Sequence, residues 1–160
     1  MTMIIDGTNG LTFNNGTTQA SAGQVLQVVQ GTTSSVTSTT STTYVVTNLT
    51  ATITPKFANS KILVSLASSA TQTTVGQTSN ITVYRNGSVN IATGSLGLTA
   101  YENSGVTGYS WVSACGAIFD SPATTSATTY TVYVRAGSGG TAYANWGAMN
   151  NTLTLTEIAV

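Results

Sequence analysis

Apolar and polar residues alternate with a period of two along most of this chain, and no stretch sustains the period of a helix. Such alternation is typical of β-strands that bury one face. Asn and Gly mark the turns between the runs, while Thr and Val fill them, as is usual in β-structure. The alternation predicts four sets of core-facing side chains: Val45, Leu49, Ala51 and Ile53; Ile62, Val64 and Leu66; Tyr130, Val132 and Val134; and Leu153 with Leu155.

Two further runs carry more specific signals. The run 80–91 contains Asn86-Gly87, a pair that tolerates the positive φ angles of a type I′ turn, so a β-hairpin is predicted there. The run "YSWVSACGAIFD", residues 109–120, is apolar on both faces. This pattern predicts a central strand or a strand covered by another subunit. Cys115 within it is expected to be a small buried core residue.

From Val25 onward we count about eight strand-like runs with no helix between them, which predicts an all-β fold, an antiparallel β-sandwich or jelly roll. The first 23 residues are different, because Asp6-Gly7, Asn9-Gly10 and Asn15-Gly16 divide them into short apolar pieces. We therefore divide the chain into an N-terminal attachment segment, residues 1–23, and a head domain, residues 24–160. The segment is too short to own a core, so its apolar side chains are expected to attach it to another protein: Ile4, Ile5, Leu11 and Phe13.

Charged residues make up only 5% of the 160 residues, where about 25% is usual in soluble domains. The net charge is zero, and the four basic residues cannot form the clustered positive charge that phosphate binding needs. We therefore expect no nucleic-acid partner. A near-uncharged monomer has poor colloidal stability, so much of the surface is expected to be buried against other copies or within a larger assembly.

Catalytic and metal-binding residue types are scarce. The chain has no histidine and a single cysteine, so it lacks the parts of a zinc site, a disulfide or a Ser-His-Asp triad. Glu102 and Asp120 could form a glycosidase pair, but the "FDSPAT" context favours a turn in which Asp120 caps local N–H groups. We expect no enzymatic activity, no metal and no cofactor.

Membrane and export signals are not evident in the pattern. The N-terminus has no basic region followed by a long apolar one, which argues against a signal peptide. No apolar run approaches the ~20 residues that cross a bilayer. These observations predict a soluble product, made in a cytoplasm and not inserted in a membrane.

Five blocks of the chain resemble a known family. The segment "GLTFNNGTTQASA", residues 10–22, resembles the Leu/Ile-Thr-Phe-Pro-Asp-Gly-Thr-Thr-Gln-x-Ser-Ala segment that recurs in bacteriophage tail fibres, with Asn14-Asn15 in place of Pro-Asp. The blocks "GQVLQVVQ", "ITPKFANSKILV", "FDSPATTSATTYTVYVRA" and "NTLTLTEIA" are similar, in order, to those of a fibre C-terminal domain common in marine and cyanobacterial phages. The resemblance implies a virion structural protein, made in the cytoplasm of a bacterial host. It also implies a homotrimeric fibre with a β-sandwich tip.

The Ser/Thr-rich run "QGTTSSVTSTTSTTYVV", residues 30–46, could be a tether or part of the fold. Thr is β-branched and favours strands, unlike the Gly/Ser composition of flexible linkers. In the resembling family a similar run lies inside the domain. We therefore predict that it is folded, with a strand over residues 40–47 and a connection or edge strand over residues 31–39.

Two turn-rich segments contain the residue types that recognise sugars and cell surfaces, namely aromatic rings beside amides and hydroxyls. "TAYANWGAMNN" contributes Tyr143, Asn145 and Trp146, and "TAYENSGVTGYSW" contributes Tyr101 and Tyr109. The alternative use of these aromatics is packing between strands or between subunits.

Two functions within a virion are consistent with these features. The first is a short tail fibre or fibre tip, fixed to the phage tail or baseplate by its N-terminus and presenting the sandwich to a host-surface glycan. The second is a decoration protein of the capsid or baseplate without receptor binding. A non-viral carbohydrate-binding module or adhesin fragment is a third reading, and the lack of a secretion signal counts against it.

Overall fold

The computed structural model describes residues 4–6, 10–12, 18–19, 24–105 and 107–160. In the N-terminal segment, β1 (Ile4–Asp6), β2 (Gly10–Thr12) and β3 (Thr18–Gln19) form a small antiparallel sheet. Ile5 and Leu11 are register partners in it. Ile4, Ile5 and Leu11 of the expected attachment residues thus lie on paired strands, whereas Phe13 falls outside the described residues.

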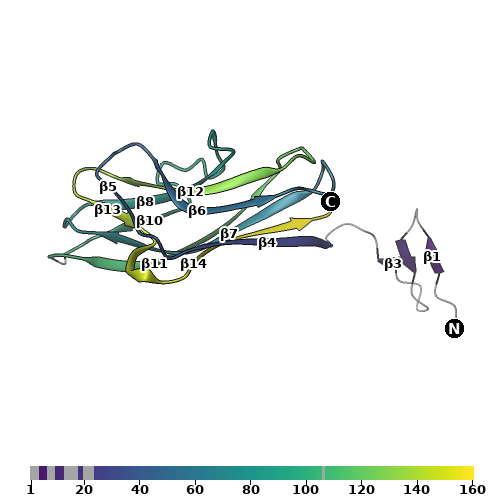
Figure 1. The fold of residues 1–160 in the computed structure, drawn as a ribbon, viewed down its shortest axis with the longest axis horizontal. Coiled ribbons are helices and arrows are strands. Elements are labelled where there is room, and N and C mark those ends of the chain that lie inside the picture. The colour runs from purple at the N-terminus through teal and green to yellow at the C-terminus, as the bar shows by residue number, and fades with distance from the viewer. Residues whose placement is uncertain (1–3, 7–9, 13–17, 20–23, 106) are drawn as a thin grey trace.

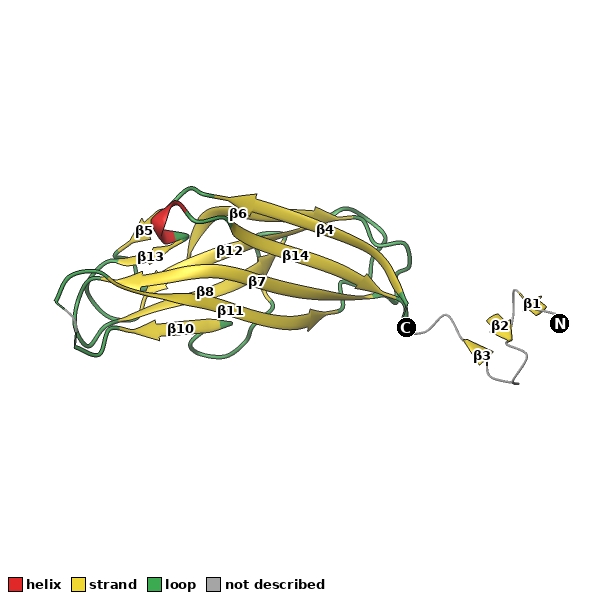
Figure 2. Cartoon of the chain, turned by 90° about the horizontal axis from the view of Figure 1, so that it is seen from below, coloured by secondary structure: helices red, strands yellow, loops and turns green. Residues whose placement is uncertain are grey.

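Two larger antiparallel sheets pack against each other and confirm the predicted β-sandwich (Figures 1 and 2). Sheet I consists of β4 (Val25–Thr33), β5 (Thr37–Thr39), β7 (Lys61–Gln72), β11 (Ser110–Asp120), β13 (Ala142–Ala144) and β14 (Asn151–Ile158). Sheet II consists of β6 (Val45–Ile53), β8 (Thr78–Arg85), β9 (Val89–Asn90), β10 (Thr99–Glu102) and β12 (Thr128–Ala136).

The order of the strands is that of a jelly roll. Sheet I runs β11, β7, β14 and β4 from edge to edge, and sheet II runs β10, β8, β12 and β6. The eight long strands cross between the sheets at every step except from β8 to β10, which both lie in sheet II, and this gives the nested pattern of two Greek keys. In sheet I, β13 lies end to end with β14 along the same side of β7, and β5 continues the line of β4.

The core lies between the sheets and contains the residues that alternation predicted, except Val45, which is only half-buried; Ile81, Val83 and several alanines complete it. Burial alternates strictly along β12 and β14, and along β6 from residue 47. This agreement follows from the geometry of a strand, in which successive side chains point to opposite faces. The fully buried members include Leu49, Ile53, Ile62, Val64, Tyr130, Val132, Val134, Leu153 and Leu155.

The predicted hairpin is present between β8 and β9. Asn86 and Gly87 have φ angles of 49° and 69°, as a type I′ turn requires. The N–H of Ser88 donates to the carbonyl of Arg85 at 3.2 Å and closes the turn.

The Ser/Thr-rich run is folded, as predicted, but its strand boundaries differ. Residues 31–33 end β4 and residues 37–39 form β5 at the edge of sheet I, whereas the next strand begins only at Val45. Local hydroxyl bonds explain the delay, because the N–H of Ser41 donates to the hydroxyl of Thr39 and the N–H of Thr43 to that of Ser41. Such bonds compete with strand pairing.

The interpretation of residues 109–120 as a central strand is wrong. Among the described strands, β11 pairs with β7 alone and is an edge strand of sheet I. Cys115, expected to be buried, is exposed, as are Trp111 and Phe119 on the same outward face. The outward face of β11 is therefore largely apolar and exposed in the single chain. No strand among the described residues pairs with its free edge.

The two ends of the sandwich are distinct. At the base end the chain enters β4, and the N–H of Ala159 donates to the carbonyl of Gln24 at 2.9 Å. At the far end β7 finishes at Gln72, opposite Ser110 and Ala142. β7 runs from one end to the other, a span of about 36 Å at ~3.3 Å per residue.

Candidate binding site

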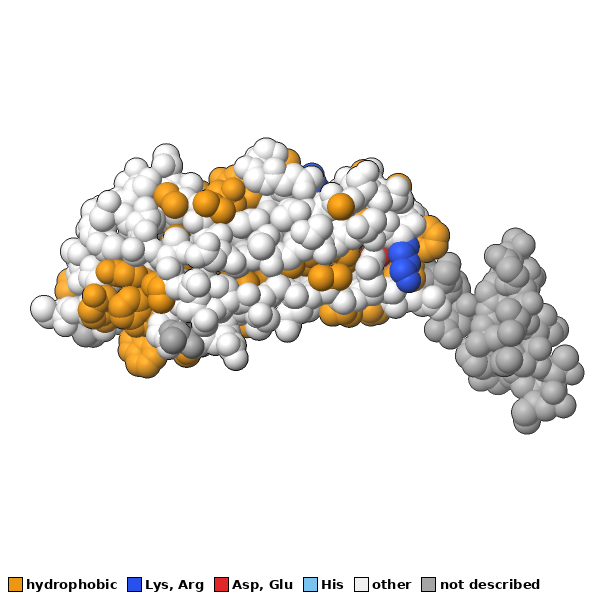
Figure 3. Space-filling model, viewed as in Figure 1, with side chains coloured by type: hydrophobic (Ala, Val, Ile, Leu, Met, Phe, Trp, Pro, Cys, Tyr) orange, Lys and Arg blue, Asp and Glu red, His pale blue; other side chains and the backbone are white. Residues whose placement is uncertain are grey.

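Three aromatic rings gather at the far end. The rings of Tyr109 and Trp146 are stacked, with centroids 4.6 Å apart and an angle of 21° between their planes. The ring of Tyr143 meets both at steep angles, with centroids 4.8 Å from Trp146 and 5.8 Å from Tyr109. Figure 3 shows apolar side chains gathered on the surface at this end. The fold thus joins three residues that the sequence selected from two separate segments.

Different elements hold the rings on the two sides of β7. Tyr143 is the middle residue of β13, where Thr71 of β7 is its register partner. Trp146 opens the 3-10 turn η1 (Trp146–Ala148), in which Gly147 has a φ of 83° that glycine adopts without strain. Tyr109 arrives from the opposite side, directly before β11, and its side chain is 54% exposed. The cluster therefore spans the end of β7.

Buried polar groups fix the loop that carries Trp146. The Oδ1 atom of Asn145 accepts a hydrogen bond from the hydroxyl of Ser68 at 2.9 Å, and its N–H donates to the carbonyl of Ser69 at 3.0 Å. The hydroxyl of Ser69 donates to the carbonyl of Trp146 at 3.0 Å. Oδ1 of Asn151 accepts from the N–H of Ser69 at 3.1 Å. Asn145 is fully buried and supports the loop. The sequence had suggested that its side chain lies at the surface.

Tyr101 stands apart from the three rings. It lies in β10 of sheet II, is half-buried and packs against the core. Its hydroxyl is hydrogen-bonded to the hydroxyl of Ser110 at the start of β11. Tyr101 therefore ties the two sheets together, which is the packing role that the sequence left open as the alternative to binding.

The cluster is electrically neutral. Burial among the rings raises the pKa of Tyr143, and hydrogen bonding with Tyr109 raises it further. The hydroxyl of Tyr143 is therefore protonated at neutral pH and able to donate or accept a hydrogen bond. Ring faces combined with neutral hydroxyls suit a ligand with apolar C–H faces and hydroxyl groups, as a sugar has.

The two carboxylates considered as a catalytic pair lie at opposite ends of the sandwich. Glu102 ends β10 beside Thr78, near the far end, whereas Asp120 ends β11 opposite Ile62 at the base end. Glycosidases hold their carboxyl groups about 5–10 Å apart. These two residues therefore cannot act together within one chain.

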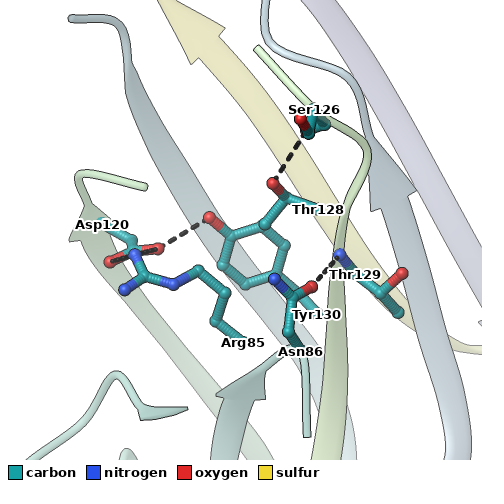
Figure 4. A network of polar contacts seen from close by, with 7 residues as sticks. All are labelled: Arg85, Asn86, Asp120, Ser126, Thr128, Thr129 and Tyr130. Atoms are coloured by element: carbon teal, nitrogen blue, oxygen red, sulfur yellow. Dashed lines mark hydrogen bonds and ion pairs between the residues drawn. The ribbon is translucent and has the colours of Figure 1, made fainter. Parts of the chain in front are cut away.

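The sequence suggested that Asp120 caps a turn, but its carboxylate is used elsewhere. Its carboxylate accepts hydrogen bonds from Nη1 of Arg85 at 2.7 and 2.8 Å and from the hydroxyl of Tyr130 at 2.7 Å (Figure 4). Asp120 belongs to sheet I, and its two partners belong to sheet II. Burial and the bond to Asp120 raise the pKa of Tyr130, which keeps it a neutral donor. The group is an ion pair that joins the sheets.

Two surface hollows accompany these features. One, of about 180 Å³, lies beside the Trp146 loop and is lined by Ala67, Ser68, Ser113, Cys115 and residues 149–151. It is smaller than the ~300–1,000 Å³ usual for small-molecule sites. The other, of about 330 Å³, lies at the base end between Leu26, Phe57 and Val160. Neither contains the charged groups that an ionic cofactor needs.

Trp111 is a surface aromatic that the sequence reasoning missed. It is 63% exposed, and it lies in the row of sheet I that also contains Thr71 and Tyr143. Its place in an apolar run suggested a central strand. The usable signal was Ser113, a small polar residue at an outward position of the run, which is typical of an exposed face.

Among the residues that the structure describes, no group of His, Cys, Asp or Glu is placed to hold a metal, and no helix is long and apolar enough to cross a membrane. No protein-family model matches the chain, and no curated protein matches it.

Proposed function

We propose that this protein is a virion structural protein, a short tail fibre or fibre tip that binds a host-surface glycan. The observation that carries the proposal is the surface cluster of Tyr109, Tyr143 and Trp146 at the end opposite the chain entry, in which Tyr109 is exposed and the other two are half-buried. A sandwich anchored at its base presents such a cluster to whatever lies beyond the particle. Loops at one end of a rigid β-scaffold are where binding usually resides.

The base end supports the attachment half of the proposal. The N-terminal segment leads into β4 there, beside the hollow lined by Leu26, Phe57 and Val160. Phe57 and Val160 are both more than half exposed. Apolar side chains that remain exposed at an entry point are suited to contact with a tail or baseplate protein.

The aromatic cluster also favours a glycan over a charged ligand. The cluster consists of two tyrosines and one tryptophan, which carry no charge, and the groups that support it are hydroxyls and amides. Ring stacking contributes about 0.5–1.5 kcal/mol per contact beyond burial, which suits the weak, repeated binding of surface polymers.

Two measurements test this proposal. Immunogold electron microscopy of phage particles, with antibodies against residues 24–160, should label the tail tip or baseplate. Label over the head would instead support the decoration alternative, and unlabelled particles would overturn both. An array of bacterial surface polysaccharides should bind the full chain and lose binding for Trp146→Ala. Asn48→Ala, an exposed change on β6 of sheet II, is the matched control.

A further inference from the structure

The outer face of sheet I has almost no charge. Three rows of register partners cross its four long strands. They contain Ser, Thr, Ala, Cys and Gln, and the row nearest the base end also contains Phe119, Leu63 and Val28. Lys61, at the base corner, is the only charged residue at an outward position in β4, β7, β11 and β14, all of whose residues are described. From β11 to β4 the rows are Phe119, Leu63, Thr156 and Val28; Ala117, Ser65, Thr154 and Gln30; and Cys115, Ala67, Thr152 and Thr32.

Among the described residues, the loop at residues 149–150 borders the third row at the hollow that Ala67 and Cys115 line, and no strand covers the rows. β7 has strands on both sides, yet Ala67 in its middle is exposed on the outer face. The equivalent outward positions of β8 in sheet II, Asn80 and Thr82, are buried. There the segment after β9 folds back, and the hydroxyl of Thr82 bonds to Asn90 at 2.6 Å. Sheet II thus has a cover from its own chain, and sheet I does not.

The free edge of β11 is also unprotected. β11 is 11 residues long, pairs with β7 without a register shift, and has no proline or lysine. β10 and β5, at other sheet edges, have only 4 and 3 residues, whereas the 9-residue edge strands β4 and β6 lie against each other at the side of the sandwich. Proteins usually shield a long edge with charges, prolines or bulges because its unpaired backbone groups attract other strands. An edge without these devices indicates that it is covered in the assembled state.

We infer that the outer face of sheet I, with the β11 edge, is a contact surface for a second copy of this chain. The four strands span roughly 19 Å by 30 Å, on the order of 600 Å². A standard interface buries about 800 Å² per partner, so this face supplies most of that area and the adjoining β11 edge extends it. The cores of protein interfaces are depleted of charge, and the chain itself, with 8 charged residues in 160, supplies a neutral partner surface.

A second copy fits better than a charged partner. A charged protein or an anionic membrane would lose hydration against rows that offer no opposite charge, which costs free energy without a compensating ion pair. The small side chains of Ser65, Ala67 and Ala117 also allow a neighbouring backbone to approach closely. The inference goes beyond the proposed function and does not depend on glycan binding.

Cys115 provides a direct measurement because it lies within these rows and is exposed in the single chain. In the native full-length protein, its thiol should react with a maleimide at least about tenfold more slowly than in the guanidinium-unfolded protein, since a covered group reacts only on opening. Light scattering should give the mass of more than one chain. A monomeric mass, or equal labelling rates in the native and unfolded protein, overturns the inference.

A charge introduced into the rows tests whether the contact lies on this face. Ala67→Arg places a cation in the middle of the rows, and it should reduce the mass to that of one chain and restore fast labelling of Cys115. Asn48→Arg, an exposed strand position on sheet II, should change neither. An Ala67→Arg protein with native circular dichroism, unchanged mass and protected Cys115 overturns the assignment of this face. If that variant does not fold, Cys115 protection in the native protein decides.

Discussion

The two ends of the sandwich are stabilised in different ways. At the base end, two carboxylates are buried or half-buried and hydrogen-bonded: Asp120 binds Arg85 and Tyr130, and Glu157 accepts from Gln27 and from the N–H of Lys56. At the far end, the rings of Tyr109, Tyr143 and Trp146 rest on a loop fixed by neutral hydroxyls and amides.

This difference separates stability from binding along the molecule. Asp120 joins strands of both sheets, and Glu157 joins β4 of sheet I to the loop after β6, so removal of either carboxylate takes the acceptor from part-buried donors. At the far end, the ring of Tyr109 stacks on Trp146, so its removal leaves the hydrogen bonds of the loop that carries Trp146 in place. We therefore expect the free energy of unfolding to depend on the base end and ligand binding to depend on the far end.

The largest effect is expected for Glu157→Ala. Glu157 is fully buried, and its carboxylate accepts from Nε2 of Gln27 at 2.5 Å and from the N–H of Lys56 at 2.7 Å. Alanine removes the acceptor of both bonds and leaves the N–H of Lys56 without it, while Nε2 of Gln27 keeps its bond to the carbonyl of Thr54. The loss of two hydrogen bonds to a charged group should lower the free energy of unfolding by about 3 kcal/mol. Urea unfolding monitored by circular dichroism measures it. A loss below ~1 kcal/mol, the value of one ordinary hydrogen bond, would contradict the role of Glu157.

Glu157→Gln supplies the pH control. Burial alone would raise the pKa of Glu157, but hydrogen bonds from Gln27 and from the backbone of Lys56 and Phe57 outweigh it and hold the pKa below its usual 4.5. A carboxyl group with a lowered pKa contributes stability that is complete above its unfolded pKa. That contribution is lost as the pH falls through the lower folded pKa. The wild-type chain should therefore lose more stability than Glu157→Gln between pH 6 and acid pH, and parallel losses would exclude this assignment.

A smaller effect is expected for Tyr130→Phe. The change removes one hydroxyl, which donates to Asp120 at 2.7 Å, and leaves the buried ring and the Arg85–Asp120 ion pair in place. The loss of one hydrogen bond to a charged group should reduce the free energy of unfolding by about 1.5 kcal/mol. The same urea titration measures it. No loss at all would mean that Arg85 alone satisfies Asp120, and the link between the sheets would then depend on the ion pair.

The sequence predicted the fold well because strands with one buried face carry their own signal. Leu153 and Leu155 alternate with threonines, and both are buried as expected. Asn86-Gly87 likewise specified its turn through backbone preferences alone. Both signals are local, so one chain segment is enough to read them.

The errors occurred where burial depends on distant partners. The run that contains Cys115 is apolar on both faces, and alternation cannot say whether a second face is covered by this chain, by another copy or by solvent. Asn145 was selected for its amide, but its burial depends on Ser68, 77 residues away. Asp120 was assigned to a local turn for the same reason. Long-range hydrogen bonds leave no trace in the neighbouring sequence.

The smallest change in stability, and the sharpest test of the comparison between the ends, is expected for Tyr109→Ala. Tyr109 is more than half exposed and precedes β11 without belonging to it, so its loss should reduce the free energy of unfolding by no more than about 0.5 kcal/mol. The same change removes the ring stacked on Trp146 and should abolish most polysaccharide binding. A melting temperature that falls as far as that of Tyr130→Phe would mean that the far-end rings are structural. In that case both ends would stabilise the fold, and the binding surface would have to lie elsewhere.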